Sequence, residues 1–416
     1  MSNGPRSLSI TVLVCLFATI LISSCGTWKA LTTRDDKPKE PKADRPSRLT
    51  QFTPEATIRV LWRRNIGRGI GRKFIDLSPA IDDGIVYAAD AYGFVTAIDR
   101  ETGRFQWVTR IGRPAGKGFM NVMDRSDPAF VTGGLGVGAD MIYVGTARGE
   151  VVALSASDGE ERWRVVLTSE VLAPPIASRD AVYAQTSDGN LFALALEDGS
   201  QKWVFHTQNP LVTLRGTSTP IFNAGIVYAG FATGILSAID STSGELLWEQ
   251  AISLPTGTSD LERMVDVDGK PLVEQGVVVA STHQGTTTAL RRSDGIPLWQ
   301  AEVASTRALQ SGYGLVFAVT DDDEVVGIEQ RDGTVAWRHE GLLRRQLTDP
   351  LAFSNYIFVG DLQGFVHVIA QSDGRLIARR RVDSAAIQPT MAHEDGVVYL
   401  LTKGGRLIAL ELDRSA

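Results

Sequence analysis

Residues able to catalyse a reaction or to hold a metal are few in this chain and scattered along it. No pair of histidines has the His-Glu-x-x-His spacing, and no cysteine pair stands near them to complete a zinc site. No Gly-x-Ser-x-Gly sequence marks a hydrolase nucleophile. We therefore expect no catalytic residue and no metal site. We expect surface or hydrogen-bonded strand roles for His206, His283, His339, His367 and His393.

Two short sequences imitate ligand-binding motifs. "GLGVGA", from Gly134 to Ala139, has the glycines of a dinucleotide fingerprint but leads into the strand-like "MIYVG" instead of a helix, so we interpret it as an inserted loop. The acidic run from Asp321 to Glu324 offers carboxylates to a hard cation. Its spacing does not fit an EF-hand, and we predict a solvated hairpin tip.

The one position where covalent chemistry is expected is Cys25. Residues 1–24 carry Arg6 and then an apolar run over residues 8–22, shorter than the roughly 20 residues that span a bilayer, which predicts a secretory signal peptide. The sequence "ISSC" resembles a bacterial lipobox, whose cysteine is acylated and becomes the new N-terminus. Gly26 follows where Asp would favour the inner membrane, so the resemblance implies outer-membrane retention. The alternative is an ordinary cleavage site that a cysteine happens to follow.

The residues after Cys25 predict a tether and not a folded domain. Residues 26–53 are rich in Pro, Lys, Asp and Arg and nearly lack large apolar side chains. We therefore divide the chain into a signal peptide (residues 1–24), an acylated cysteine with a disordered tether (25–54) and a folded part (55–416). Because Cys15 leaves with the signal, the mature chain keeps no thiol pair. Its formal charge, -6 for the whole chain and -7 without Arg6, disfavours nucleic acid as a partner.

The folded part is a repeat that predicts an all-β protein. "AIDRETGRFQW" ends at Trp107, and related sequences end at further positions, each with Gly or Asp fourteen residues earlier. Short alternating or apolar segments bounded by Gly, Asp or Asn indicate four strands in each copy. Four strands at a spacing of roughly 40 to 56 residues predict the blades of a β-propeller. The terminal positions are Trp107, Trp163, Trp203, Trp248, Trp299, Trp337 and Ala378.

The repeat count predicts eight four-stranded antiparallel blades closed by the N-terminal strand. The eighth copy ends at residue 416 before its fourth strand. Residues 58–67, "IRVLWRRNIG", have the pattern of that missing strand, and Trp62 takes the place of the terminal tryptophan. Pairing the two chain ends would remove an exposed sheet edge.

We expect the tryptophans to pack between blades and not to bind a ligand. Each would bury roughly 150 to 250 Å² of ring surface against its neighbour. Ala378 breaks the pattern, so we expect blade seven to be among the weaker blades. The docking residues are Trp62, Trp107, Trp163, Trp203, Trp248, Trp299 and Trp337.

Two long connections that flank blade four are the predicted binding loops. They are "NPLVTLRGTSTP" before Pro220 and "GTSDLERMVDVDGKP" before Pro271, and both mix apolar and charged residues. Alternatively, Asp266 and Asp268 only shape a turn. The basic, glycine-rich stretch of residues 63–74 has two interpretations. It could contact anionic lipid or an acidic partner surface, or it could be a solvated loop.

The motifs carry a resemblance to known families. Ala97, Asp99, Thr102, Gly103 and Trp107 match "AxDxxTGxxxW", which resembles the tryptophan-docking repeat of the quinoprotein dehydrogenase-like propellers. Together with the lipobox, "GRGIGRKF", "LRG" and "MVDVD", the chain resembles the BamB family, the lipoprotein subunit of the outer-membrane β-barrel assembly machinery.

That resemblance implies a non-catalytic scaffold without a cofactor, anchored by lipid to the outer membrane and facing the periplasm. It implies binding to the periplasmic domains of the central barrel-forming subunit, help with the insertion of outer-membrane proteins, and unfolded outer-membrane proteins as a further partner. The implied contact residues are Leu214, Arg215, Asp266, Asp268 and Val212, the last standing where the family more often has leucine.

Two other functions stay open. A quinone-dependent dehydrogenase would fit the docking repeat, but such enzymes use an adjacent-cysteine disulfide and a calcium-centred carboxylate cluster, and the mature chain has no thiol pair. A periplasmic module that binds a sugar, a peptide or another envelope complex is the second alternative.

Overall fold

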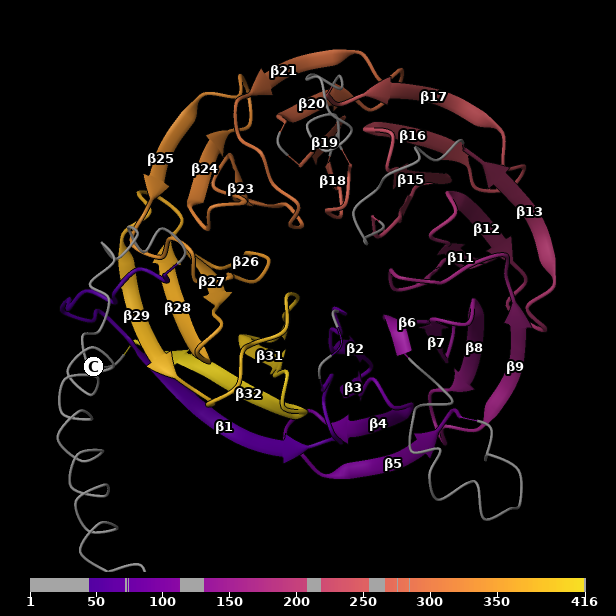
Figure 1. Ribbon diagram of the computed structural model, residues 1–416, viewed down its shortest axis with the longest axis horizontal. Coiled ribbons are helices and arrows are strands. Elements are labelled where there is room, and N and C mark those ends of the chain that lie inside the picture. The colour runs from indigo at the N-terminus through magenta and orange to yellow at the C-terminus, as the bar shows by residue number, and fades with distance from the viewer. Residues whose placement is uncertain are drawn as a thin grey trace, which may run out of the picture. The chain divides into compact units, whose positions relative to one another are not determined.

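The computed structural model describes residues 45–71, 73, 75–112, 131–207, 218–253, 266–274, 276–283 and 285–414. The predicted signal peptide, Cys25 and the tether up to residue 44 lie outside these residues. Pro46–Ala416 forms one compact unit. Its described residues form eight four-stranded antiparallel sheets arranged in a ring (Figure 1), so the predicted eight-bladed propeller is confirmed.

The strands of each blade run from a (innermost) to d (outermost). Blade one contains β2 (Ala80–Asp82), β3 (Ile85–Ala89), β4 (Phe94–Asp99) and β5 (Phe105–Arg110); blade two β6 (Val131–Gly138), β7 (Met141–Thr146), β8 (Glu150–Ser155) and β9 (Glu161–Val166); blade three β10 (Ile176–Ala177), β11 (Val182–Gln185), β12 (Asn190–Leu194) and β13 (Gln201–His206); blade four β14 (Ile221–Asn223), β15 (Ile226–Gly230), β16 (Ile235–Asp240) and β17 (Leu246–Ala251).

Blade five contains β18 (Leu272–Glu274), β19 (Val277–Ser281), β20 (Thr287–Arg291) and β21 (Pro297–Ala301); blade six β22 (Gln310–Gly312), β23 (Leu315–Val319), β24 (Val325–Glu329) and β25 (Val335–His339); blade seven β26 (Leu351–Phe353), β27 (Tyr356–Gly360), β28 (Phe365–Ala370) and β29 (Leu376–Arg381); blade eight β30 (Ala392–Glu394), β31 (Val397–Leu401), β32 (Arg406–Asp413) and β1 (Thr57–Asn65).

The core lies between blades, because strands b and c are covered on both faces. β3 (IVYAA) and β8 (EVVALS) are buried over nearly their whole length, whereas the d strand β5 has an exposed side. Continuous runs of β-branched and small residues suit strands buried on both faces. Outer strands instead need polar residues, which explains why the alternating pattern is clearest in the d strands.

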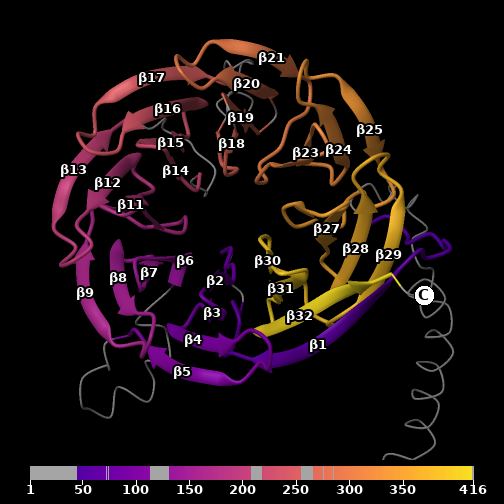
Figure 2. The same cartoon turned by 180° about the vertical axis from the view of Figure 1, so that it is seen from behind.

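The ring closes through the two ends of the folded part. β1 pairs antiparallel with β32 from Thr57 opposite Asp413 to Asn65 opposite Arg406. Figure 2 shows β1 along the outside of β32 in the last blade. This pairing confirms the predicted closure, and it removes the sheet edge that β32 would otherwise expose.

A contact between an indole ring and a glycine turn joins consecutive blades. Each ring packs on a glycine between strands c and d of the following blade, at φ between +66° and +77°. Each indole N–H donates to a carbonyl of that blade at 2.7 to 3.0 Å. The pairs are Trp62 with Gly103, Trp107 with Gly159, Trp163 with Gly199, Trp203 with Gly244, Trp248 with Gly295, Trp299 with Gly333 and Trp337 with Gly374.

Ala378 has no such partner because blade eight has no turn between strands c and d. Those two strands, β32 and β1, come from opposite ends of the chain. The chain before β1 covers this place instead: the Glu55 N–H donates to the Ile377 carbonyl at 2.9 Å, and Ala56 is buried in the same cluster as Ala378. The sequence pattern does not reveal this contact, and the weakness of blade seven stays a prediction.

Residues 46–54, assigned to the tether by composition, pack on blades six and seven. The Ser47 N–H donates to the Leu343 carbonyl at 3.0 Å, and the Arg379 guanidinium lies 5.1 Å from the Phe52 ring. Leu49 packs against the core cluster between these blades. The compact unit therefore includes residues 46–54, which the composition placed in the tether.

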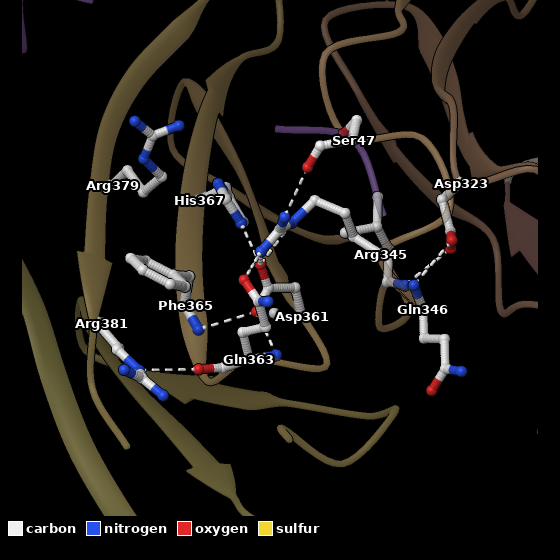
Figure 3. A network of polar contacts seen from close by, with 12 residues as sticks. Ser47, Asp323, Arg345, Gln346, Asp361, Gln363, Phe365, His367, Arg379 and Arg381 are labelled. Carbon is white, nitrogen blue, oxygen red and sulfur yellow. Dashed lines mark hydrogen bonds and ion pairs between the residues drawn. The ribbon is translucent and has the colours of Figure 1, made fainter. Parts of the chain in front are cut away.

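A buried polar network holds this segment and joins blades six and seven (Figure 3). Arg345 donates to the Asp361 carboxylate at 2.8 Å and to the Ser47 carbonyl at 2.8 Å. His367 also contacts that carboxylate, with Nε2 to Oδ2 at 3.0 Å, and all three charged or titratable side chains are buried. Partnered charges of this kind are tolerated in a core, whereas loss of one partner is costly.

The glycine-rich residues 134–138 belong to strand β6 and do not form the inserted loop predicted above. The register of β6 against β7 shifts between Val131 and Leu135. A Cβ atom on Gly136 would lie 1.7 Å from the Pro175 carbonyl oxygen. The glycines are therefore explained by the close approach of two backbones.

The indole–turn contact predicts a difference between two glycines of blade four. Gly244 and Gly225 have φ of +76° and +82°, but a Cβ on Gly244 would lie 2.7 Å from the Trp203 ring, whereas nothing lies within 4 Å at Gly225. We expect Gly225→Ala to cost about 1–2 kcal/mol from the left-handed backbone alone. Gly244→Ala should cost a further 1–3 kcal/mol of overpacking, measured by urea unfolding. Equal losses for the two variants would contradict the proposed contact.

The buried histidine predicts a loss of stability in mild acid. Burial lowers the pKa of His367, although Asp361 opposes this shift. The unfolded chain, with a histidine pKa of about 6.5, therefore takes up a proton first, and stability should fall as the pH drops from 7 to 5. His367→Gln, whose amide can still donate to Asp361, should reduce this fall in urea unfolding. The control His206→Gln, at an exposed residue, should leave it unchanged; an unaltered pH dependence in His367→Gln would refute the assignment.

Candidate partner-binding face and central cavity

The antiparallel order of the strands separates two faces of the ring. Turns between strands b and c lie on the same face as the connections between blades, and the other two hairpins of each blade lie opposite. Backbone hydrogen bonds join the two loop types: Val171 donates to Thr146 at 3.1 Å and Ser305 to Thr282 at 3.2 Å. We call this side the connector face.

The two predicted binding loops meet at their bases on this face. Val212, Leu214 and Arg215 lie in residues 208–217, outside the described part of the chain. Ser218, directly after that stretch, is buried, and its hydroxyl donates to the Gly269 carbonyl at 3.0 Å. The structure therefore brings the end of one predicted loop against the end of the other.

Asp266 is buried and joins two blades. Its side chain is 1% exposed, and its carbonyl accepts the His283 N–H of blade five at 3.1 Å. The next residue, Val267, donates to the Phe231 carbonyl of blade four at 3.2 Å. For Asp266 this placement favours the alternative considered from the sequence, a role in shaping the loop.

Asp268 is partly exposed and lines the central cavity. Burial, followed by repulsion from Asp266 and Asp321, raises the pKa of its carboxyl group to about 7. His283 Nδ1 lies 3.0 Å from Asp321 Oδ2, so the neighbouring carboxylate already has a partner. Asp268 lines the cavity, where its carboxyl group could accept an incoming cationic group.

The cavity has a volume of about 870 Å³ and is lined by charges of both signs. Burial raises the pKa of Asp349, against the effect of Arg307, and lowers the pKa of Lys270. Among the described residues, no group of three or more His, Cys, Asp or Glu side chains is placed to hold a metal ion. The charged lining residues are Asp76, Asp268, Lys270, Arg307, Asp349 and Lys403.

Apart from Asp268, the sequence analysis missed these lining residues, although a signal for some of them exists. Strand a begins at or near a proline in most blades, and the residue before that proline points to the cavity. The residues concerned are Ser78, Pro174, Thr219, Lys270 and Asp349.

The histidines have structural contacts instead of sharing one site. His206 contacts Asn190 at 2.8 Å, His339 contacts the Gly374 carbonyl at 2.9 Å, and His393 stacks on Phe353 with ring centroids 4.7 Å apart. With His283 on Asp321 and His367 on Asp361, each histidine lies in a different environment.

The acidic run 321–324 forms a hairpin tip between β23 and β24, but it is not simply solvated. Asp323, at φ +67°, is buried, and its carboxylate accepts the N–H groups of Gln346 and Leu347 at 2.7 Å. Asp thus replaces the usual glycine at this turn and also fixes the next connection.

The basic, glycine-rich residues 63–74 pack on blade one in their described part. Arg64 donates to the Gly103 carbonyl at 2.5 Å, and the charged ends of Arg68 and Lys73 lie 5.6 and 4.0 Å from the Tyr92 ring. Arg72 and Phe74 lie outside the described residues. Over the described residues, no helix combines the length and hydropathy needed to cross a membrane.

Comparison with known proteins gives consistent matches. A family model described as outer membrane protein assembly factor BamB matches residues 121–339. The BamB protein of Escherichia coli is 34% identical over 395 residues, 95% of this chain and 97% of the relative. BamB from Moraxella catarrhalis has a TM-score of 0.75 at 25% identity and covers 85% of this chain and 99% of its own.

Several dehydrogenases share the fold. The quinohemoprotein alcohol dehydrogenase of Comamonas testosteroni has a TM-score of 0.65 at 14% identity, covering 85% of this chain and 76% of its own. Identity this low shows a common architecture and nothing about activity.

The raised pKa of Asp268 predicts that its amide variant is more stable at high pH. The unfolded carboxyl group, with a pKa of about 3.9, ionises before the folded one, so its ionisation opposes folding increasingly from pH 4 to above 7. Asp268→Asn should therefore exceed the native chain in unfolding free energy at pH 8 by more than at pH 4.5. The control is Asp198→Asn, because backbone hydrogen bonding to Ser200 lowers the pKa of that exposed carboxyl and its effect should stay constant from pH 5 to 8. If the gain in unfolding free energy of Asp268→Asn over the native chain does not grow with pH, the placement of Asp268 near Asp266 and Asp321 is wrong.

Proposed function

Because the chain belongs to the family of the outer membrane protein assembly factor BamB, we propose that it serves outer-membrane protein assembly as a non-catalytic scaffold. In this proposal it is anchored by lipid at Cys25, faces the periplasm, and binds the periplasmic domains of the central barrel-forming subunit. Relatives over nearly the whole chain are named assembly factors, which supports the role in outer-membrane protein assembly.

The observation that carries the binding proposal is the meeting of the two long connections. The Ser218 hydroxyl donates to Gly269, one residue after Asp268, so residues from both loops can contact one partner surface. Loops on a rigid scaffold are the usual place for binding residues. The eight joined blades supply that scaffold.

We assign different roles to the residues of this face. Arg215 would pair with a partner carboxylate, and Leu214, with Val212 beside it, would fill a small apolar pocket; buried anchors of this type dominate interface energies. Asp268 would accept a partner cation, which would favour its ionised form. Asp266, which is buried, would contribute indirectly by fixing the position of residues 266–268.

The same proposal excludes a quinone-dependent reaction. The mature chain lacks the thiol pair that the docking-repeat enzymes use. Addition of pyrroloquinoline quinone and calcium to the purified chain, with an alcohol or a sugar as electron donor, should give no dye reduction. Turnover above that of a heat-denatured sample would overturn the non-catalytic assignment.

Arg215→Glu should abolish co-purification of the barrel-forming subunit from detergent-solubilised membranes, because the new carboxylate would repel the proposed partner group. The matched control is Arg179→Glu, an exposed arginine in the turn between β10 and β11 on the opposite face of blade three. It should leave recovery unchanged.

Circular dichroism of both variants should match that of the native chain. If the Arg215→Glu variant recovers as much barrel-forming subunit as the native chain does, Arg215 is not part of the interface. If the barrel-forming subunit does not co-purify with the native chain either, the remaining interpretation is a scaffold of another envelope complex.

A further inference from the structure

The outer strand of every blade carries a β-bulge at the same place. The residue before the terminal tryptophan or alanine is the extra residue in the pairing of strands c and d. A bulge at a sheet edge redirects backbone groups and often marks a contact point. The bulge residues are Leu61, Gln106, Arg162, Lys202, Leu247, Leu298, Ala336 and Ile377.

Blade seven shows what can cover such a bulge. The extended segment before β1 lies on it, and the Glu55 N–H donates to the carbonyl of the bulge residue Ile377 at 2.9 Å. Ile377 is 1% exposed as a result. Two cations of β29 and its turn hold the segment: Arg375 pairs with the Glu55 carboxylate at 3.0 Å, and Arg379 donates to the Thr50 carbonyl at 2.7 Å.

Blades four and five have an apolar bulge that nothing in the described structure covers. Leu247 is 50% exposed and Leu298 is 47% exposed. Leu246 and Ile296 extend the surface, and Ile296 follows the glycine that packs on Trp248. Figures 1 and 2 both show β17 and β21 side by side along the outer rim. We call Leu246, Leu247, Ile296 and Leu298 the rim patch.

Three other blades have basic residues at or beside the same position, whereas the bulge residues of blades one and six are Gln106 and Ala336. The bulge residues of blades two and three are Arg162 and Lys202, and Leu61 of blade eight stands between Arg59 and Arg63. Charged side chains, lysine especially, keep foreign strands off an exposed edge. The rim patch has no basic residue at these positions: Glu245 and Glu249 flank Leu247, and Ile296 and Gln300 flank Leu298.

The charges beside the rim patch are opposite to those of blade seven. In the shared register, Glu245 of blade four takes the position of Arg375, and Glu249 takes the position of Arg379. Both glutamates are exposed. On blade four the blade-five turn at Gly295 already packs on Trp248, so a docking segment would contact the exposed bulge beside this turn. There it would need basic groups where the chain's own segment has an acidic one.

We propose that the rim patch binds an extended, apolar and basic segment of an unfolded outer-membrane protein. One backbone N–H of the segment bonds to the Leu247 carbonyl, apolar side chains cover Leu247 and Leu298, and lysine or arginine pairs with Glu245 or Glu249. Extended peptides commonly bind sheet edges in this way, with backbone bonds for affinity and side-chain contacts for selectivity. Alternation of apolar and polar residues is typical of strands of outer-membrane barrels. The identity of the segment rests on the proposed function.

The test uses the purified full-length chain and a labelled ten-residue peptide with leucine at alternate positions and two lysines. Fluorescence anisotropy should show binding that the double variant Leu247→Arg, Leu298→Lys weakens at least tenfold, since it copies the residues of blades two and three. The exposed-site control Arg162→Ala should bind as the native chain does. Thermal unfolding should be the same for all three proteins.

A charge exchange tests the assigned pairing. The native chain should bind a peptide with two glutamates in place of lysines at least tenfold more weakly, and Glu245→Lys, Glu249→Lys should reverse this preference. Equal binding of both peptides, or equal binding by the native chain and the leucine variant, would overturn the proposal.

The remaining outcomes separate this inference from the proposed function. If the folded double variant Leu247→Arg, Leu298→Lys no longer co-purifies with the barrel-forming subunit, the rim patch belongs to the interface with that subunit. This result would overturn the proposal. Self-association in sedimentation that the leucine variant abolishes would make a second copy the occupant, with the same consequence. Retained peptide binding by Arg215→Glu supports the inference, even if the barrel-forming subunit is never recovered.

Discussion

The contact between an indole ring and a glycine turn is the interaction on which the ring depends. It joins each blade to the next by apolar packing, by one hydrogen bond from the indole N–H and by a backbone conformation that glycine alone adopts readily. Seven such contacts occur among the described residues, and together they fix the rotation between neighbouring blades. The loops at either face can therefore vary in length and composition without disturbing the scaffold.

Closure of the ring by the two chain ends leaves blade seven without the usual indole–turn contact, and a different segment of the chain replaces that contact. Because β1 and β32 are not joined by a turn, the seventh blade has no glycine on which a tryptophan could pack, and alanine stands at that position. The segment before β1 occupies the vacant edge and is held there by Glu55 on Arg375 and by Ser47 on Arg345. The link towards the predicted membrane anchor is thereby attached to blades six and seven.

The proposed binding surfaces lie where individual blades differ from the other copies of the repeat. The long connections around blade four place Asp268 and the neighbouring loop on the connector face, and the apolar bulges of blades four and five differ from the charged bulges of blades two and three. These departures leave the inner strands unchanged, since the buried residues of those strands are required by packing between blades. One scaffold can therefore present separate surfaces to a folded partner and to an extended one.

Periodic spacing in the sequence was enough to predict the strands, the eight blades, the closing strand at residues 58–67 and the positions of the docking tryptophans. Local chemistry determines these features, because every blade must bury equivalent apolar strands and most blades turn at equivalent glycines. The packing of residues 46–54, the burial of Asp266, the charged cavity and the strand at Gly134 were decided only by tertiary structure. Each depends on contacts between residues far apart in the chain, such as Ser47 with Arg345 or Gly136 with Pro175, which leave no periodic signal in the sequence.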